Sequence, residues 1–461
     1  MSLKKIITKE IAERFLTEEL DIKEHTEIEA AAAKALANQC DVLHLDGLTS
    51  LSEKAAAALA KHEGFLSLAG ITNMSVGVAK ALANHRSDLN LHGLTSLDES
   101  AAEALAKHAG DLGLDGLTNL DDKVAKALAM HVGEFLSLDG LTDLDDKIAE
   151  ALAKHEGFLS LNGLKSLSDK AADALAKHNG VLFLFGLASL DESSGHIALA
   201  AKLVEPSDGL SIDELQLSDE YVGHFGLEGN LMHFDDEFMP GLNSLSSGAA
   251  LELAKYEGFL RLNGLTSLSE GAANALAKHE DYLSLNGLLN LSEKVAEALA
   301  KHEGDLHLDG LTSLSKDVAE GLANHEGDLF LNGLTNLSEK AAEALSKHKG
   351  DLSLNGLTSL NEKAAEALSK HEGDLHLDGL TSLSEDVAAS LAKHEGNLSL
   401  HSLASLSDKG AEALSKHKGF LSLSGLASLS DKGAEALARH QGFVSLNGKA
   451  KKTFDKYKQS N

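Results

Sequence analysis

The chain has 461 residues, with 41 Lys and Arg against 71 Asp and Glu and a formal charge of −30. It contains two prolines and no tryptophan, and 4% of its residues are aromatic, although 43% are apolar. This apolar content excludes a disordered chain, and the acidic balance argues against a nucleic-acid partner, because phosphate binding depends on Lys and Arg. A single cysteine, Cys40, excludes an intrachain disulfide framework and a multi-cysteine metal site.

The first forty residues differ from the rest of the chain. Ile7, Ile11, Phe15 and Leu20 recur near helical spacing with charges between them. We predict that residues 1–40 form an N-terminal helical cap; binding of a partner by this face is the alternative. No apolar run is long enough for a signal peptide or a membrane span, so the default expectation is a soluble, cytoplasmic protein, with export by a route without a cleavable signal left open.

From residue 41 the chain is periodic. Histidines recur at a spacing of 23 residues in two runs, His62 to His178 and His279 to His440, with one spacing of 24 between His131 and His155. A fixed period of this length indicates a stacked solenoid. We therefore predict regular repeats over residues 41–190 and 246–448. The histidines are His62, His85, His108, His131, His155, His178, His279, His302, His325, His348, His371, His394, His417 and His440.

One repeat shows the expected local structure. Leu352 and Leu354 alternate with polar residues, which is typical of a short strand. Leu357 and Leu360 are expected to point inward, Asn361 is expected to cap a helix, and Gly373 is expected to adopt a left-handed conformation after it. Alanine, leucine and histidine at 3.6-residue spacing form the inner helix face: Ala364, Ala365, Ala367, Leu368 and His371.

The repeat length selects the architecture. Two packed helices need about 34 residues, so a 23-residue unit holds one strand and one helix. The leucines at Leu352, Leu354 and Leu357 or Leu360 resemble the pattern of the leucine-rich-repeat family. The resemblance implies an α/β solenoid with a concave parallel sheet, helices on the convex side, and a concave surface that commonly binds proteins. Leu357 falls where many family members carry Asn or Cys, so the usual asparagine ladder is not expected.

Residues 191–245 interrupt the repeats. We predict two degenerate repeats with acidic protruding loops, because unique sequence among near-identical repeats favours a specific contact. The alternative is a decayed repeat or a hinge. The partner-binding candidates in the second loop are Phe234, Asp235, Asp236, Glu237 and Phe238.

Aromatic residues next to the strand leucines form a second candidate set. If they lie on the open face of the sheet, they supply anchors for a partner; the alternative is that they are tucked under neighbouring turns. The candidates are Phe135, Phe158, Phe183, Phe185, Phe259 and Tyr282.

The histidine row invites a metal or proton-relay interpretation. One histidine per turn produces a line instead of a tetrahedral site, so we favour a structural ladder and expect no metal or other cofactor. Acidic pairs such as Asp121–Asp122 and Asp145–Asp146 could hold calcium, but helix capping explains them as well.

The C-terminal residues 449–461 are basic and are expected to form a cap or tail; contact with the acidic body of another copy is the alternative. No acid, base and nucleophile converge in the sequence, so no enzyme is expected. The sequence favours a non-enzymatic scaffold that binds a protein partner on the concave sheet and the acidic loops. A self-assembling structural protein is the alternative.

Overall fold

The computed structural model describes residues 5–17, 22–38, 42–205 and 239–458. The chain divides into two compact units, residues 1–242 and 243–461. The two degenerate repeats predicted over residues 191–245 are described only in part. Residues 206–238, which include Phe234, Asp235, Asp236, Glu237 and Phe238, lie outside the described residues.

The first unit alternates short parallel strands with helices. Its strands β3 to β9 form one seven-stranded sheet in chain order, and β1 and β2 pair separately in the N-terminal segment. The strands are β1 (Ile6–Ile7), β2 (Glu27–Ile28), β3 (Val42–His44), β4 (Phe65–Ser67), β5 (Leu89–Asn90), β6 (Leu112–Gly113), β7 (Phe135–Ser137), β8 (Phe158–Ser160), β9 (Leu182–Phe183) and β10 (Ser189–Leu190). The helices are α1 (Lys9–Thr17), α2 (Ala30–Leu36), α3 (Glu53–Leu59), α4 (Val76–Leu82), α5 (Glu99–Leu105), α6 (Asp122–Leu128), α7 (Asp146–Leu152), α8 (Asp169–Leu175) and α9 (Ser194–Val204).

The second unit repeats this arrangement with a nine-stranded parallel sheet, β12 to β20. Its strands are β11 (Ser244–Leu245), β12 (Leu260–Arg261), β13 (Leu283–Ser284), β14 (Leu306–His307), β15 (Leu329–Phe330), β16 (Leu352–Ser353), β17 (Leu375–His376), β18 (Leu398–Ser399), β19 (Leu421–Ser422) and β20 (Val444–Ser445). Its helices are α11 (Ser247–Leu253), α12 (Glu270–Leu276), α13 (Glu293–Leu299), α14 (Lys316–Leu322), α15 (Glu339–Leu345), α16 (Glu362–Leu368), α17 (Glu385–Leu391), α18 (Asp408–Leu414), α19 (Asp431–Ala438) and α20 (Gly448–Lys458).

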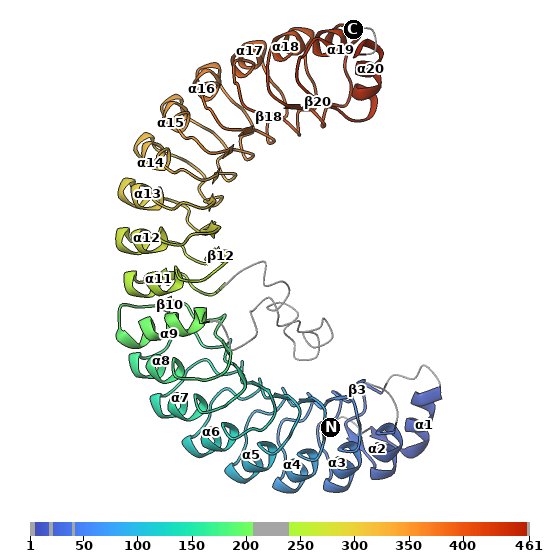
Figure 1. The fold of residues 1–461 in the computed structure, drawn as a ribbon. Coiled ribbons are helices and arrows are strands. Elements are labelled where there is room, and N and C mark those ends of the chain that lie inside the picture. Colours follow the sequence, from blue (N-terminus) through green and yellow to red (C-terminus); the bar gives the residue numbers. More distant parts are fainter. Residues whose placement is uncertain (1–4, 18–21, 39–41, 206–238, 459–461) are drawn as a thin grey trace. The chain divides into compact units, whose positions relative to one another are not determined.

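Each unit is an α/β solenoid of the leucine-rich-repeat type, which confirms the predicted fold class. Within each unit the strands line the concave side and the helices form the convex side (Figure 1). The strand register advances by 23 residues, as in the pairing of Leu352 with Leu375. Between β6 and β7 the register is 24, since Leu112 pairs with Leu136. The additional residue lies in the loop between His131 and Leu136, and the sheet continues without a gap.

The core of a repeat follows the expected leucine and alanine pattern. Leu352, Leu354 and Leu357 are fully buried, as are the inner helix residues Ala364, Ala365 and Leu368, whereas Leu360 is only half-buried. The Asn361 side chain caps α16 by accepting a hydrogen bond from the Ala364 backbone N–H at 2.9 Å. These contacts bury the inner faces of both elements, which neither element could bury by itself.

The repeat glycines are required for close approach of neighbouring turns. A Cβ on Gly356 would lie 2.0 Å from the carbonyl oxygen of Asn332, and one on Gly373 would lie 2.3 Å from the carbonyl oxygen of Gly350. The expectation of a left-handed Gly373 is wrong, because among the described glycines only Gly258 and Gly448 have positive φ. Glycine is required at the helix end because a Cβ there would clash with the backbone of the neighbouring turn, and not because the residue has a positive φ.

The repeat histidines form one stacked row in each unit. In the second unit the ring centroids of successive histidines lie 5.9 to 6.1 Å apart, with interplanar angles of 3 to 9°. This spacing is wider than the ~4.8 Å between adjacent strands. The difference agrees with the curvature of the unit, since layers farther from the concave sheet are spaced more widely.

A polar ladder joins the turns at a position that the sequence did not indicate. The residue after the second strand leucine is usually Asn or Asp, and its side-chain oxygen accepts the backbone N–H of the same position in the next repeat. Asn332, for example, accepts from Asn355 N–H at 2.9 Å and from the Ser353 hydroxyl at 2.7 Å. The ladder runs from Asn263 to His401 in the second unit. The expected lack of an asparagine ladder therefore holds only for the position of Leu357.

Candidate functional site

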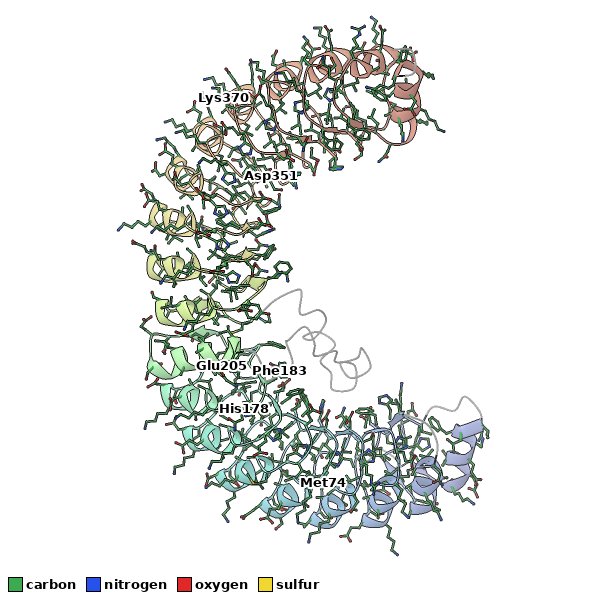
Figure 2. All side chains as sticks on the ribbon, in the orientation of Figure 1. Met74, His178, Phe183, Glu205, Asp351 and Lys370 are labelled. Carbon is green, nitrogen blue, oxygen red and sulfur yellow. The ribbon has the colours of Figure 1, made fainter. Side chains whose placement is uncertain are left out.

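Two of the four aromatic candidates of the first unit are buried. Phe135 is 0% exposed and Phe183 is 5% exposed, with ring centroids 6.3 Å apart. Phe158 and Phe185 pack against the same cluster and remain partly exposed. Phe135 and Phe183 are therefore not open to a partner, and for these two rings the alternative of burial among neighbouring turns agrees with the structure. Figure 2 shows Phe183 on the strand side of its unit.

The second unit carries a continuous row of aromatic side chains on its sheet, here called the aromatic strip: Phe259, Tyr282, His307 and Phe330. Phe259 meets Tyr282 edge-on at 5.2 Å, Tyr282 lies 4.3 Å from His307, and His307 stacks on Phe330 at 3.8 Å. Phe259 is 58% exposed and the other three are partly exposed. The strip crosses β12 to β15, so four neighbouring repeats contribute to one surface.

Arg261 adds a cation to this surface. Its guanidinium carbon lies 5.4 Å from the Phe259 ring centroid and 5.2 Å from that of Tyr282. A guanidinium at this distance is attracted to the ring faces, which holds the rings and the cation in one arrangement. Phe259 and Tyr282 were identified from the sequence. Arg261, His307 and Phe330 were expected to face outward, because they lie between two strand leucines, but they were not among the binding candidates.

The structure also brings together Ser422, His401 and Asp378, which no sequence motif had indicated. The Ser422 hydroxyl lies 3.1 Å from His401 Nε2, and His401 Nδ1 lies 2.9 Å from an Asp378 oxygen. Burial raises the pKa of Asp378, but hydrogen bonds from Ser399 and His401 outweigh it and hold that pKa below its ordinary value.

This order of groups matches a nucleophile, a base and an orienting carboxylate. However, Ser422 is 1% exposed, so a substrate carbonyl cannot reach its hydroxyl in this arrangement. The sequence feature that could have indicated this cluster is His401, because it occupies the position at which other repeats carry the Asn or Asp of the polar ladder. We interpret the three side chains as a local variant of that ladder.

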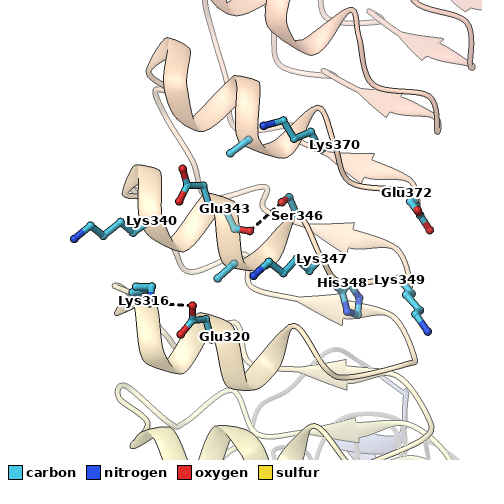
Figure 3. Close-up of a pocket in the computed structure, with 12 residues that line it drawn as sticks. Lys316, Glu320, Lys340, Glu343, Ser346, Lys347, His348, Lys349, Lys370 and Glu372 are labelled. Carbon is cyan, nitrogen blue, oxygen red and sulfur yellow. Dashed lines mark hydrogen bonds and ion pairs between the residues drawn. The ribbon is translucent and has the colours of Figure 1, made fainter.

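On the helix side of the second unit, a groove of about 590 Å³ lies over α14 to α16. Lysines and glutamates line it together, including Lys347, Lys370 and Glu343 (Figure 3). Lys316 pairs with Glu320 at 3.0 Å within it. The mixed charge favours no particular ligand. Lys347 and Lys370 follow the C-terminal ends of α15 and α16, where the helix dipole favours a cation.

Burial lowers the pKa of histidines inside both rows, such as His85 and His131 in the first and His325 and His371 in the second. Desolvation is the largest cause, and neighbouring imidazoles add to it, so the pKa of His325 is about 4. A row of parallel, neutral rings does not converge on one point. Among the described residues, no group of three or more His, Cys, Asp or Glu side chains is placed to hold a metal ion.

Comparison with known proteins gives structural neighbours alone. No protein-family model matches the sequence, and no curated protein is similar to it. A leucine-rich-repeat protein of Leptospira interrogans is 16% identical, with 86% of this chain and 93% of that chain covered and a TM-score of 0.33. An internalin of Listeria monocytogenes is 14% identical, with coverage of 91% and 95% and a TM-score of 0.31. In the described part of the chain, no helix has the length and apolar character of a membrane span.

Proposed function

We propose that the protein is a non-enzymatic scaffold that binds another protein through the concave sheet of its second unit. The observation that carries this proposal is the aromatic strip with Arg261. Exposed aromatic rings beside an arginine are the residue types that most often supply the binding energy of protein interfaces. Short strands and tightly packed turns hold them on a rigid surface, so little conformational freedom is lost on binding.

The two ends of the chain fit the role of caps for such a scaffold. Ile7 and Ile28 are buried at the N-terminal end, and Phe454 of α20 is buried at the C-terminal end. The lysines of α20 remain exposed, and Lys458 donates a hydrogen bond to the His440 carbonyl at 3.3 Å. A polar outer layer over the last turn keeps a solenoid soluble. We propose that residues 1–40 cap the first repeat and that residues 449–461 cap the last one.

The test is comparative pull-down from the source cells with quantitative mass spectrometry. Tagged wild-type protein is compared with the double variant Phe259→Ser/Tyr282→Ser and with a control, Lys347→Ser/Lys370→Ser, on the helix side. We expect the Phe259→Ser/Tyr282→Ser variant, here called the strip variant, to capture at least tenfold less of each protein that the wild type captures. The control variant should capture the same amounts as the wild type. Equal capture by wild type and strip variant would contradict the proposal, provided that circular dichroism shows both to be folded.

A further inference from the structure

The residue directly before each strand of the nine-stranded sheet belongs to a single row across the second unit. The 23-residue register places these residues side by side, one per strand. In chain order the row reads Phe259, Tyr282, Asp305, Asp328, Asp351, Asp374, Asn397, Phe420 and Phe443. Here it is called the pre-strand row. Figure 2 shows its member Asp351 on the strand side, opposite Lys370 on the helix side.

Both ends of the pre-strand row are aromatic and open. Phe259 is 58% exposed and contacts Tyr282. At the other end Phe420 and Phe443 stack with centroids 5.7 Å apart and an interplanar angle of 10°, and they are 37% and 70% exposed. Exposed rings in pairs form apolar contact points that single exposed side chains do not.

The middle of the pre-strand row carries four carboxylates. Asp305 is exposed, and Asp328, Asp351 and Asp374 are partly exposed. One oxygen of Asp328 accepts the Asp351 N–H at 2.8 Å, and one oxygen of Asp351 accepts the Asp374 N–H at 2.8 Å. The hydrogen bonds therefore orient the carboxylates, while the negative charges remain at the surface.

The flanking loops add further charge. The residue two positions before each aspartate is an exposed acid in three of the four repeats, Glu303, Glu326 and Glu372, and an exposed lysine, Lys349, in the other. The band between the aromatic pairs is therefore negative overall. Positive charge on a partner would complement it and would speed association at low salt.

We infer that the pre-strand row binds an extended segment of a partner protein that carries Lys or Arg in its middle and an apolar residue at each end. Six strand steps separate Tyr282 from Phe420, which is about 29 Å at ~4.8 Å per step. An extended chain covers that distance in about nine residues at ~3.3 Å per residue. The inference rests on the proposed function, and it adds the chemistry and length of the partner segment.

The test uses short synthetic peptides and fluorescence anisotropy with the full chain. The probe is a fluorescein-labelled ten-residue peptide with leucine at both ends and four lysines between them, separated by serines. Two comparison peptides replace the lysines with glutamates or the leucines with serines. We expect the lysine peptide to bind at least tenfold more tightly than the glutamate peptide, with an advantage that shrinks as salt rises.

The matched protein variants separate charge from structure. Replacing Asp305, Asp328, Asp351 and Asp374 by asparagine removes four charges and keeps a hydrogen-bond acceptor, as Asn397 already does when it accepts the Phe420 N–H at 2.9 Å. Replacing the exposed helix residues Glu297, Glu343, Glu366 and Glu412 by glutamine changes the net charge equally on the other face. We expect the asparagine variant to bind the lysine peptide about tenfold more weakly and the glutamine variant to bind it as the wild type does.

Equal binding of the lysine and glutamate peptides, or equal weakening by both variants, would overturn the inference. If the strip variant still loses its captured proteins in that case, the proposed function stands and only the partner chemistry is wrong. Sedimentation velocity on the same variants gives a further outcome. A wild-type oligomer that dissociates in the asparagine variant would identify a second copy as the occupant and would overturn the assignment to another protein.

Discussion

The imidazole rings of His325 and His348 lie within 3° of parallel, with centroids 5.9 Å apart, and both residues are 1% exposed. Each ring is also a neighbour of the next one along the row. A proton on one ring would therefore be placed in a site that excludes water and beside another titratable ring. For this reason the fold binds protons at these histidines less readily than the unfolded chain does.

Acidification is expected to destabilise the solenoid between about pH 6.5 and 4. Burial lowers the pKa of His325, His371 and His417 to about 4, with smaller contributions from neighbouring histidines. The unfolded chain takes up protons first as pH falls below 6.5, so the free energy of unfolding decreases by up to about 1.4 kcal/mol per histidine per pH unit. Thermal melts by circular dichroism at pH 7, 6 and 5 check this; identical melting temperatures would contradict it.

Asp111 in the first unit opposes this effect, and His371 in the second unit supplies a control variant. Burial, with help from Asp88, raises the pKa of Asp111 to about 7, so protonation of Asp111 favours the folded state and offsets part of the loss in the first unit. Replacing His371 by leucine removes one titrating group from the second unit. The slope of the unfolding free energy against pH reports the number of protons taken up on unfolding. We expect this number to be lower by about one in the variant, whatever its stability at pH 7.

The Asn332 side chain is expected to contribute to stability through the ladder. Asn332→Leu removes the acceptor of the Asn355 N–H and the Ser353 hydroxyl and should cost about 1 to 3 kcal/mol, because buried donors are left without partners. Asn332→Asp should cost less, since Asp309 and Asp378 serve the same role in other repeats. Urea unfolding of the two variants measures the difference. Equal stability of both would show that the ladder contributes little.

Gly356→Ala is expected to destabilise its repeat by several kcal/mol or to shift the neighbouring turn. The new Cβ would lie 2.0 Å from the Asn332 carbonyl oxygen, well inside van der Waals contact. Gly433→Ala in α19 is the control, because its Cβ would lie 3.3 Å from the nearest atom and other repeats carry alanine there. That change should be neutral or slightly stabilising, as alanine favours helices. Urea unfolding that ranks the two variants in the opposite order would contradict the packing argument.

The phenylalanines of the two units should respond differently to substitution. Phe135→Ser is expected to cost about 3 to 5 kcal/mol because it empties a fully buried site. Phe259→Ser should cost less than about 1 kcal/mol, since more than half of its surface is already in water. Unfolding curves of both variants test this. A large loss for Phe259→Ser would indicate that the ring supports the fold and would weaken its role as a binding anchor.

The sequence predicted the repeat well because each repeat carries its own local signals. The Leu352–Leu354 alternation, the Asn361 cap and the alanine face lie within about fifteen residues of one another, and the structure has all of them. The histidine row was also predicted, since a constant spacing makes a line in any stacked fold. The strands β1 and β2 in the N-terminal segment were missed, because two-residue strands leave almost no periodic signal.

The exposure of the aromatic side chains could not be predicted in the same way. Phe135 and Phe259 occupy equivalent places in their repeats, yet one is buried and the other is open. The difference comes from residues on other turns. Phe135 on β7 packs near Phe183 on β9, whereas Phe259 lies directly before the first strand of its sheet, with an aromatic neighbour on one side. Such contacts join residues of separate repeats, so the sequence of a single repeat does not predict them.

The 24-residue repeat between His131 and His155 has a practical consequence. Its additional residue is absorbed ahead of β7, while the rings of His131 and His155 still stack at 5.9 Å and Leu136 still pairs with Leu159. The segment between helix and strand thus tolerates a change in length that the leucine and alanine positions would not. One residue inserted at the equivalent place in another repeat would therefore leave the strand pairing and the histidine stacking of the solenoid intact.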